Sequence, residues 1–158
     1  MTTKIPITLT GYDQLQEEIK VLKTTERPAV IQAIADAREH GDLKENAEYH
    51  AARERQSFIE GRISDLEDKQ SRVEVIDPLK MTGTVIKFGA TVQLIDEETE
   101  KELTYQIVGE YESNFEQGKL ALTAPLSRAL IGKTVGDSVQ VNTPKGAKAY
   151  EVLQVAYK

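Results

Sequence analysis

The first half of the chain carries apolar residues at the three-and-four spacing of a helix face, in two stretches separated by a polar turn at residues 40–50. The first stretch should begin with Thr10 as its N-cap. It should break near residues 25–27, because Pro28 removes a backbone hydrogen bond and clashes with the preceding turn. The second stretch has the alternating spacing of a two-stranded coiled coil. The positions concerned are Leu15, Ile19, Leu22, Val30, Ile34 and Ala37 in the first stretch and Ala52, Gln56, Ile59, Ile63, Leu66, Gln70 and Val73 in the second.

The polar turn is expected to join the two helices into an antiparallel hairpin. A connection of only a few residues returns the chain alongside the helix that it has just left. With about thirty residues in each helix and a rise of about 1.5 Å per residue, the turn would lie roughly 45 Å from the base of the hairpin. We therefore expect a slender hairpin with an exposed tip near residues 41–48.

From Gly83 onward the apolar spacing changes to alternation, which indicates strands. Asp77 precedes a proline and should mark the boundary, because such a residue avoids the helical region. Residues 125–132 are instead expected to form a short helix. We predict an α+β fold, with a coiled-coil hairpin over residues 1–77 and a mainly antiparallel sheet domain with one short helix over residues 79–158. The strands are predicted at residues 84–87, 90–95, 102–108, 119–122, 138–142 and 147–157.

The composition narrows the functional classes. The chain has no cysteine, so disulfides and thiolate metal sites are excluded, which favours a reducing compartment. The apolar runs are too short for a membrane span or a signal peptide, and we expect a cytoplasmic protein. The formal charge of −6 argues against a stand-alone nucleic-acid binder, because such proteins gain affinity by neutralising phosphates.

Three carboxylates, those of Asp42, Glu45 and Glu48, lie at or near the turn. Asp42 and Glu45 have the spacing of a capping box for the second helix, although this leaves Glu48 unexplained. The other interpretation is metal binding, since exposed carboxylate oxygens suit Mg²⁺. Two ligands are too few for tight binding by this chain alone. The pair would then be half of a metal site that a partner and a nucleic-acid phosphate complete, as two-metal phosphodiester chemistry requires. The sequence leaves both interpretations open.

Other candidate residues carry weaker signals. His40 and His50 lack the fixed spacing of a zinc site within one helix, so exposed polar positions are the better interpretation. Tyr49 is expected to pack against the opposite helix rather than to stack on a base. Arginines of the second helix alternate with acidic residues, which indicates a solvated helix face. The sequence has no Gly-rich phosphate loop, nucleophile elbow or Ser/His/Asp grouping.

The segment from Ala37 to Glu54 resembles the coiled-coil tip of the Gre family of bacterial transcript cleavage factors, which are transcription elongation factors. The resemblance covers essentially the whole chain. It implies that the hairpin enters the secondary channel of RNA polymerase, while an FKBP-like C-terminal domain grips the polymerase at the channel mouth. The further segments that carry it are Arg27-Pro28 and residues 61–63, 88–92, 105–109 and 129–133.

The resemblance also implies roles for individual residues. Asp42 and Glu45 would help to hold a second Mg²⁺ and its attacking water in the polymerase active site, where backtracked RNA is cut. The protein would be no enzyme by itself, would bind no cofactor alone and would share Mg²⁺ with RNA polymerase only in the complex. We expect a monomer without a membrane partner, which meets the 3′ end of the nascent RNA only indirectly. Residues placed near nucleic acid are Arg38, Asn46, Tyr49, Arg53 and Arg55, and residues placed at the polymerase-docking surface are Pro125, Ser127 and Arg128.

The charge of the second helix and one departure from the family pattern refine the comparison. The mixed charge around Glu54 and Glu60 fits the GreA branch of the family better than the GreB branch, which carries a larger basic patch. Ala124 stands where the family pattern has a serine before Pro125. Two alternatives stay open: a regulator that occupies the channel without stimulating cleavage, and a prolyl isomerase, which the few aromatic residues of the C-terminal half disfavour.

Overall fold

The computed structural model describes residues 4–158 and confirms the α+β class. The chain divides into two compact units. One is Tyr12–Arg72, and the other combines the described residues up to Gly11 with Val73–Lys158. The sequence predicted two domains in succession along the chain, with a boundary at residues 77–79. In the structure, the segments before and after the hairpin both belong to the C-terminal unit.

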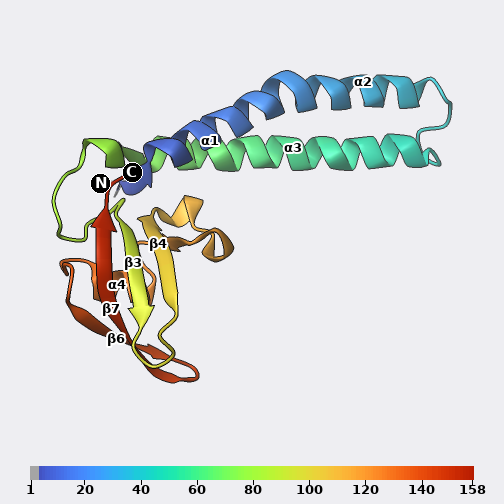
Figure 1. Ribbon diagram of the computed structural model, residues 1–158. Helices are drawn as coiled ribbons and strands as arrows, with labels where there is room; N and C mark the ends of the chain where they lie inside the picture. Colours follow the sequence, from blue (N-terminus) through green and yellow to red (C-terminus); the bar gives the residue numbers. More distant parts are fainter. Residues whose placement is uncertain (1–3) are drawn as a thin grey trace. The chain divides into compact units, whose positions relative to one another are not determined.

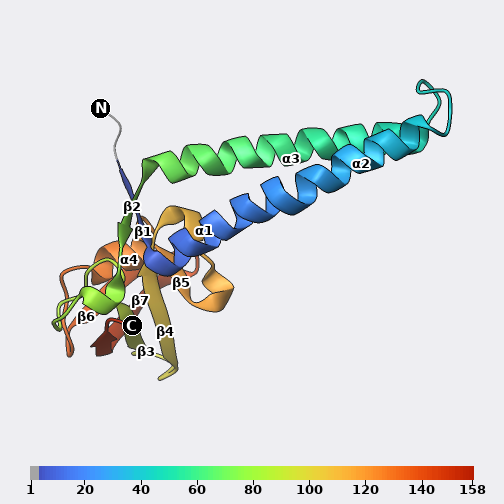
Figure 2. The ribbon, with the colours of Figure 1, turned by 90° about the horizontal axis from the view of Figure 1, so that it is seen from above.

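The helical hairpin consists of α1 (Leu9–Val21), a π-helical turn (Leu22–Glu26), α2 (Arg27–Arg38) and α3 (Ala47–Arg72). Figures 1 and 2 show α2 running antiparallel beside α3, with a single loop joining their ends. At about 1.5 Å per residue, the 26 residues of α3 span about 39 Å. No helix within residues 4–158 is long and apolar enough to cross a membrane.

The predicted break in the first helix is present as the π-helical turn. The N–H of Arg27 donates to the carbonyl of Leu22, five residues earlier, so the turn is one residue wider than an α-helical turn. Pro28 follows in the first turn of α2, where the widened backbone accommodates a residue that cannot donate a hydrogen bond. The predicted N-cap at Thr10 is wrong, because α1 begins at Leu9 and the hydroxyl of Thr8 accepts from the N–H of Gly11 at 3.1 Å.

Apolar packing and ion pairs hold the two arms of the hairpin together. Val30, Ile59 and Ile63 form a buried cluster, with Leu22 packed against it. Ion pairs flank this cluster on the outer faces. They join α3 to the first arm as Arg62–Glu18 (2.9 Å), Lys23–Glu67 (3.0 Å), Arg55–Glu26 (2.6 Å) and Arg27–Glu60 (2.8 Å).

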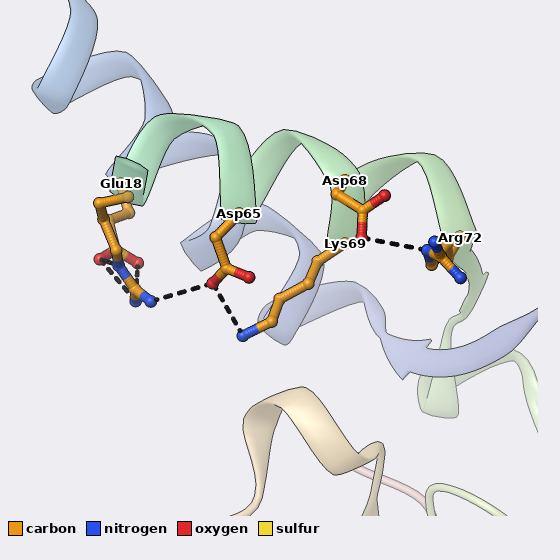
Figure 3. Close-up of polar contacts among 6 residues, drawn as sticks. Glu18, Asp65, Asp68, Lys69 and Arg72 are labelled. Carbon is orange, nitrogen blue, oxygen red and sulfur yellow. Dashed lines mark hydrogen bonds and ion pairs between the residues drawn. The ribbon is translucent and has the colours of Figure 1, made fainter. Parts of the chain in front are cut away.

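The hydrogen bonds between Arg27 and Glu60 raise the pKa of the arginine and lower that of the carboxyl. Figure 3 shows further pairs within α3, including Lys69–Asp65 at 3.4 Å and Arg72–Asp68 at 3.1 Å. Exposed pairs of this kind contribute little each. Together, the four ion pairs between the arms favour one register of the hairpin.

The C-terminal unit contains a five-stranded sheet with the order β5-β4-β3-β7-β6. All neighbours are antiparallel except β4 and β5, which run parallel. Figure 1 shows β3 between β4 and β7. The strands are β3 (Thr91–Asp96), β4 (Glu102–Val108), β5 (Lys119–Ala121), β6 (Ser138–Thr143) and β7 (Gly146–Ala156).

The short helix α4 (Pro125–Leu130) confirms the prediction of one α-helix among the strands. Leu130 is fully buried and joins the core of the sheet, whose other members are Ile86, Ala90, Val92, Leu94, Ile107, Val139 and Val152. The predicted strand at residues 84–87 is wrong. This segment makes two backbone hydrogen bonds with residues 132–133, at Gly132 N and Ile86 N, but forms no regular ladder.

A second, two-stranded sheet was not predicted. β1 (Ile5–Thr8) pairs in parallel with β2 (Val73–Ile76), so strands from before and after the hairpin lie side by side. Ile7 is buried in this pairing. The sheet explains why both flanks of the hairpin belong to the C-terminal unit.

Candidate functional site

The tip loop turns the chain sharply between α2 and α3. The N–H groups of His40 and Gly41 donate to the carbonyls of Ala37 and Arg38, which ends the first arm in a tight turn. Gly41 has a φ of +111°, a backbone conformation that favours glycine. The tip is therefore a turn with its own backbone hydrogen bonds.

Asp42 and Glu45 are exposed and line the same open hollow, which Glu48 also lines. The hollow has a volume of about 460 Å³ and includes His40, Asn46 and Ala47 in its lining. One oxygen of Asp42 accepts from the N–H of Lys44 at 3.0 Å. Within residues 4–158, the side chain of Glu45 accepts no hydrogen bond.

Of the two interpretations that the sequence left open for Asp42 and Glu45, the capping box does not agree with the structure. α3 begins at Ala47, and its N-cap is Asn46, whose side-chain oxygen accepts from the N–H of Tyr49 at 3.0 Å. Asp42 lies too far before the helix to take this position. Neither acidic side chain is used to cap α3, so their oxygens are available for another ligand.

Carboxylate oxygens fit Mg²⁺, but the tip cannot enclose a metal ion by itself. Among residues 4–158, no three or more His, Cys, Asp or Glu side chains are grouped so that they could hold a metal ion. Mg²⁺ prefers octahedral oxygen coordination and usually keeps several ligands from water or phosphate. At the tip, Asp42 and Glu45 are two exposed carboxylates that line one hollow.

Residues of both helices surround the loop. The guanidinium of Arg38 lies 5.9 Å from the centre of the Tyr49 ring, a cation–π distance. Tyr49 also contacts the edge of His50, with ring centroids 5.6 Å apart, and is half-buried. The expected packing of Tyr49 against the opposite helix is therefore present through Arg38.

Five residues were assigned to the surroundings of nucleic acid, and the structure brings three of them together. Arg38, Asn46 and Tyr49 lie at the tip and contact protein groups there. Arg55 lies further along α3 and pairs with Glu26. Arg53 is exposed and has no ion-pair partner within the part of the chain that the structure describes.

The three residues assigned to polymerase docking point in different directions from α4. Pro125 and Arg128 are exposed, but Ser127 is fully buried, and its hydroxyl has no hydrogen-bond partner among residues 4–158. Ser127 therefore faces the core rather than a partner surface, which corrects its assignment. Arg128 lines a polar hollow of about 420 Å³ together with Lys133.

Pro125 lines an apolar hollow of about 360 Å³ that sequence reasoning missed. Its most prominent members are Tyr105 and Phe115, whose rings stack with centroids 5.8 Å apart. Partial burial raises the pKa of the Tyr105 phenol above its ordinary value. Phe115 is 70% exposed. The remaining lining residues are Leu120, Ala124, Leu126, Val141, Asn142, Thr143, Pro144 and Tyr150.

Comparison with known proteins gives matches along almost the whole chain. Residues 5–75 match the family model described as transcription elongation factor, N-terminal (GreA_GreB_N). Residues 81–157 match the model for the C-terminal part of transcription elongation factor GreA/GreB. The chain is 60% identical to transcription elongation factor GreA of Caulobacter vibrioides, with 98% of each chain covered.

Two further proteins match the chain. Transcription elongation factor GreA of Cereibacter sphaeroides is 63% identical, with 98% of each chain covered. A solved structure of GreA factor homolog 1 from Thermus thermophilus is 27% identical, with 96% of this chain and 98% of that chain covered and a TM-score of 0.44.

Proposed function

Because the chain belongs to the GreA/GreB family of transcription elongation factors, we propose that it rescues arrested RNA polymerase by stimulating cleavage of backtracked RNA. The hairpin tip enters the secondary channel of the polymerase, and the polymerase performs the cleavage. The observation that carries the proposal is the pair of exposed carboxylates, Asp42 and Glu45, which share one hollow and take no part in capping α3.

The chemistry of the tip suits this role. In two-metal phosphodiester hydrolysis, Mg²⁺ stabilises the attacking and leaving oxygens. Asp42 and Glu45 supply oxygen ligands on the side open to solvent, and the polymerase and the RNA phosphate supply the others. In this proposal the active site belongs to the polymerase, and we expect the protein alone to cut no RNA.

The hairpin provides the reach that a buried target requires. The tip lies about 39 Å along α3 from Arg72, and the arms are narrow because their contacts are formed by a single apolar seam flanked by ion pairs. Ala37 is buried near the tip, where a small side chain lets the helices approach closely. A slender hairpin of this length fits a channel.

The apolar hollow beside Pro125 is the proposed polymerase contact of the C-terminal unit. Aromatic residues in a concave apolar patch are typical centres of protein interfaces. Phe115 is largely exposed in this hollow although it is a large apolar residue. Contact with a partner would remove this surface from water.

The test uses defined backtracked elongation complexes and measures the lengths and rates of RNA products. We expect Asp42→Ala and Glu45→Ala to lower the cleavage rate by roughly 10²-fold, as loss of a charge-stabilising group does, while polymerase binding stays unchanged. Glu54→Ala is the matched control, because Glu54 is an exposed carboxylate on α3 outside the tip hollow.

Two results would overturn this mechanism. If the Asp42 and Glu45 variants bind polymerase and cleave as fast as the wild type, the tip donates no ligands. If the wild type slows elongation without producing shortened transcripts, the protein is an inhibitory regulator of the channel instead.

A further inference from the structure

We propose that Asn46 and His50 are positioning residues that hold the Asp42–Glu45 segment in one conformation. The proposal rests on the function proposed above, because it concerns how the tip presents its carboxylates. The family resemblance placed Asn46 near nucleic acid, and the proposal gives it a positioning role within the tip instead. His50, which the sequence left as an exposed polar residue, gains a role as well.

Asn46 connects the two ends of the tip loop with one side chain. Its amide nitrogen donates to the carbonyl of Ala37 in the last turn of α2 at 2.6 Å, and its amide oxygen accepts from the N–H of Tyr49 in the first turn of α3 at 3.0 Å. A primary amide has its donor and its acceptor on separate atoms, whereas aspartate has no donor and serine has a single hydroxyl oxygen on a shorter side chain, which is used to cap the helix. Asparagine can therefore fix the separation of the arms as well as cap α3.

His50 holds the middle of the loop. Its Nε2 atom lies 3.1 Å from the carbonyl oxygen of Lys44, so this nitrogen carries the hydrogen and donates it. The N–H of Lys44 in turn donates to the carboxylate of Asp42 at 3.0 Å. The Lys44 residue is thus held at both of its backbone polar groups, directly beside Glu45.

The imidazole of His50 is itself supported. The backbone N–H of His50 donates to the carbonyl of Asn46 at 3.1 Å, and its ring makes a T-shaped contact with the ring of Tyr49. Tyr49 lies against the guanidinium of Arg38 on the other arm. His50 therefore contacts the Lys44 peptide, and through Tyr49 and Arg38 its ring is connected to the other arm.

This support matters because the loop is otherwise exposed. Mg²⁺ demands near-ideal octahedral geometry. A displacement of about 1 Å in a reacting or coordinating group can lower a rate by about 10²-fold. An exposed loop without fixed contacts would present Asp42 and Glu45 in many arrangements, and few of them would match a coordination shell.

A purely structural role for Asn46 is the competing explanation, and Asn46→Ser separates the two. Serine keeps the helix cap but loses the donor to Ala37. We expect the midpoint of thermal unfolding to change by no more than about 2 °C and polymerase binding to stay unchanged. Cleavage at saturating factor should slow by about tenfold or more, and half-maximal cleavage should need a higher Mg²⁺ concentration.

A pair of His50 variants tests the second contact. His50→Gln keeps a nitrogen donor at a similar distance from the backbone, whereas His50→Phe keeps the ring contact with Tyr49 but has no donor. We expect glutamine to retain most of the cleavage rate and phenylalanine to lose about tenfold or more. Equal loss in both variants, or no loss in phenylalanine, would overturn the assigned role of His50.

The order of the free tip is measured without polymerase, on the full-length protein, by NMR relaxation of the Lys44 and Glu45 amides. For these two amides we expect order parameters of about 0.85 in the wild type and below about 0.6 in Asn46→Ser and His50→Phe. Unchanged order in both variants would overturn the inference even if cleavage falls.

Failure of the inference and failure of the proposed function give different results. If Asp42→Ala cleaves like the wild type, the proposed function is wrong. If Asp42→Ala loses cleavage but Asn46→Ser and His50→Phe cleave and order the tip like the wild type, the proposed function stands and the positioning role is wrong.

Discussion

At the scale of single residues, the carboxylate of Glu112 holds β1 within the C-terminal unit. It accepts from the backbone N–H of Thr8 at 2.7 Å, from the Thr8 hydroxyl, and from the N–H of Gly109 at 3.0 Å. Thr8 is buried, so its polar groups depend on this partner. At Gly109 an added Cβ would lie 2.1 Å from the carbonyl oxygen of Pro6, and only glycine allows this close approach.

We expect Glu112→Ala to lower the free energy of unfolding by about 2–4 kcal/mol, because three donors lose a charged acceptor and those of Thr8 remain buried. Glu116→Ala is the control, since Glu116 is an exposed carboxylate a few residues away. Urea denaturation of both variants, followed by circular dichroism, measures the difference. Equal stability of the two variants would show that Glu112 does not hold β1.

At the scale of elements, the turn between β3 and β4 depends on Asp96. This carboxylate is only 5% exposed and accepts from the N–H groups of Glu98 and Thr99 at 2.9 and 3.2 Å. Lys148 lies 3.6 Å away. The backbone hydrogen bonds lower the pKa of Asp96, and the positive charge of Lys148 lowers it further. The turn also holds Glu100 at a φ of 61°, which is uncommon for a residue other than glycine.

The lowered pKa gives a pH-dependent contribution to stability. Because the pKa is lower in the folded than in the unfolded state, the contribution is fully present above the ordinary pKa of about 3.9 and is lost as the pH falls through the folded value. We expect Asp96→Asn to be less stable than the wild type at pH 7, with the difference shrinking below about pH 4. Thermal unfolding from pH 2 to pH 7 measures this. A difference that does not depend on pH would contradict the assignment to the ionised carboxylate.

At the scale of the whole molecule, the two units carry separate parts of the proposed function. The hairpin unit carries the acidic pair at its tip, and the C-terminal unit carries the apolar hollow. The parallel pairing of β1 and β2 places both flanks of the hairpin in the C-terminal unit. Binding and cleavage stimulation should therefore respond to different substitutions.

We expect Phe115→Ser to weaken polymerase binding by about tenfold or more, as loss of an aromatic interface residue does, without lowering the cleavage rate at saturating factor. The free energy of unfolding should change by less than about 1 kcal/mol, because Phe115 is 70% exposed. Leu79→Ser is the matched control, because Leu79 is 73% exposed and lies outside the hollow. Competition binding to polymerase distinguishes them, and equal affinity of both variants would place the contact elsewhere.

Much of the architecture follows from local patterns. The hairpin, its tip, the break before Pro28, α4 and five of the strands were predicted, because each leaves a periodic or turn signal within a short window. The acidic residues of the tip were also found in the sequence, since the turn that carries them is short and polar. Their arrangement was not, because the N-cap of α3 depends on where the helix begins.

The sequence by itself determined the helices of the hairpin, α4, the strands β3 to β7 and the residues at the tip, because burial of one face leaves a period in the chain. Only the tertiary structure decided the pairing of Ile5 with Val73, the choice of Asn46 over Asp42 as the cap, and the burial of Ser127. Each of these depends on a partner or a packed face that is distant in the sequence or lies across a loop. Such contacts form only when the chain has folded, and the local periodicity of the sequence does not predict them.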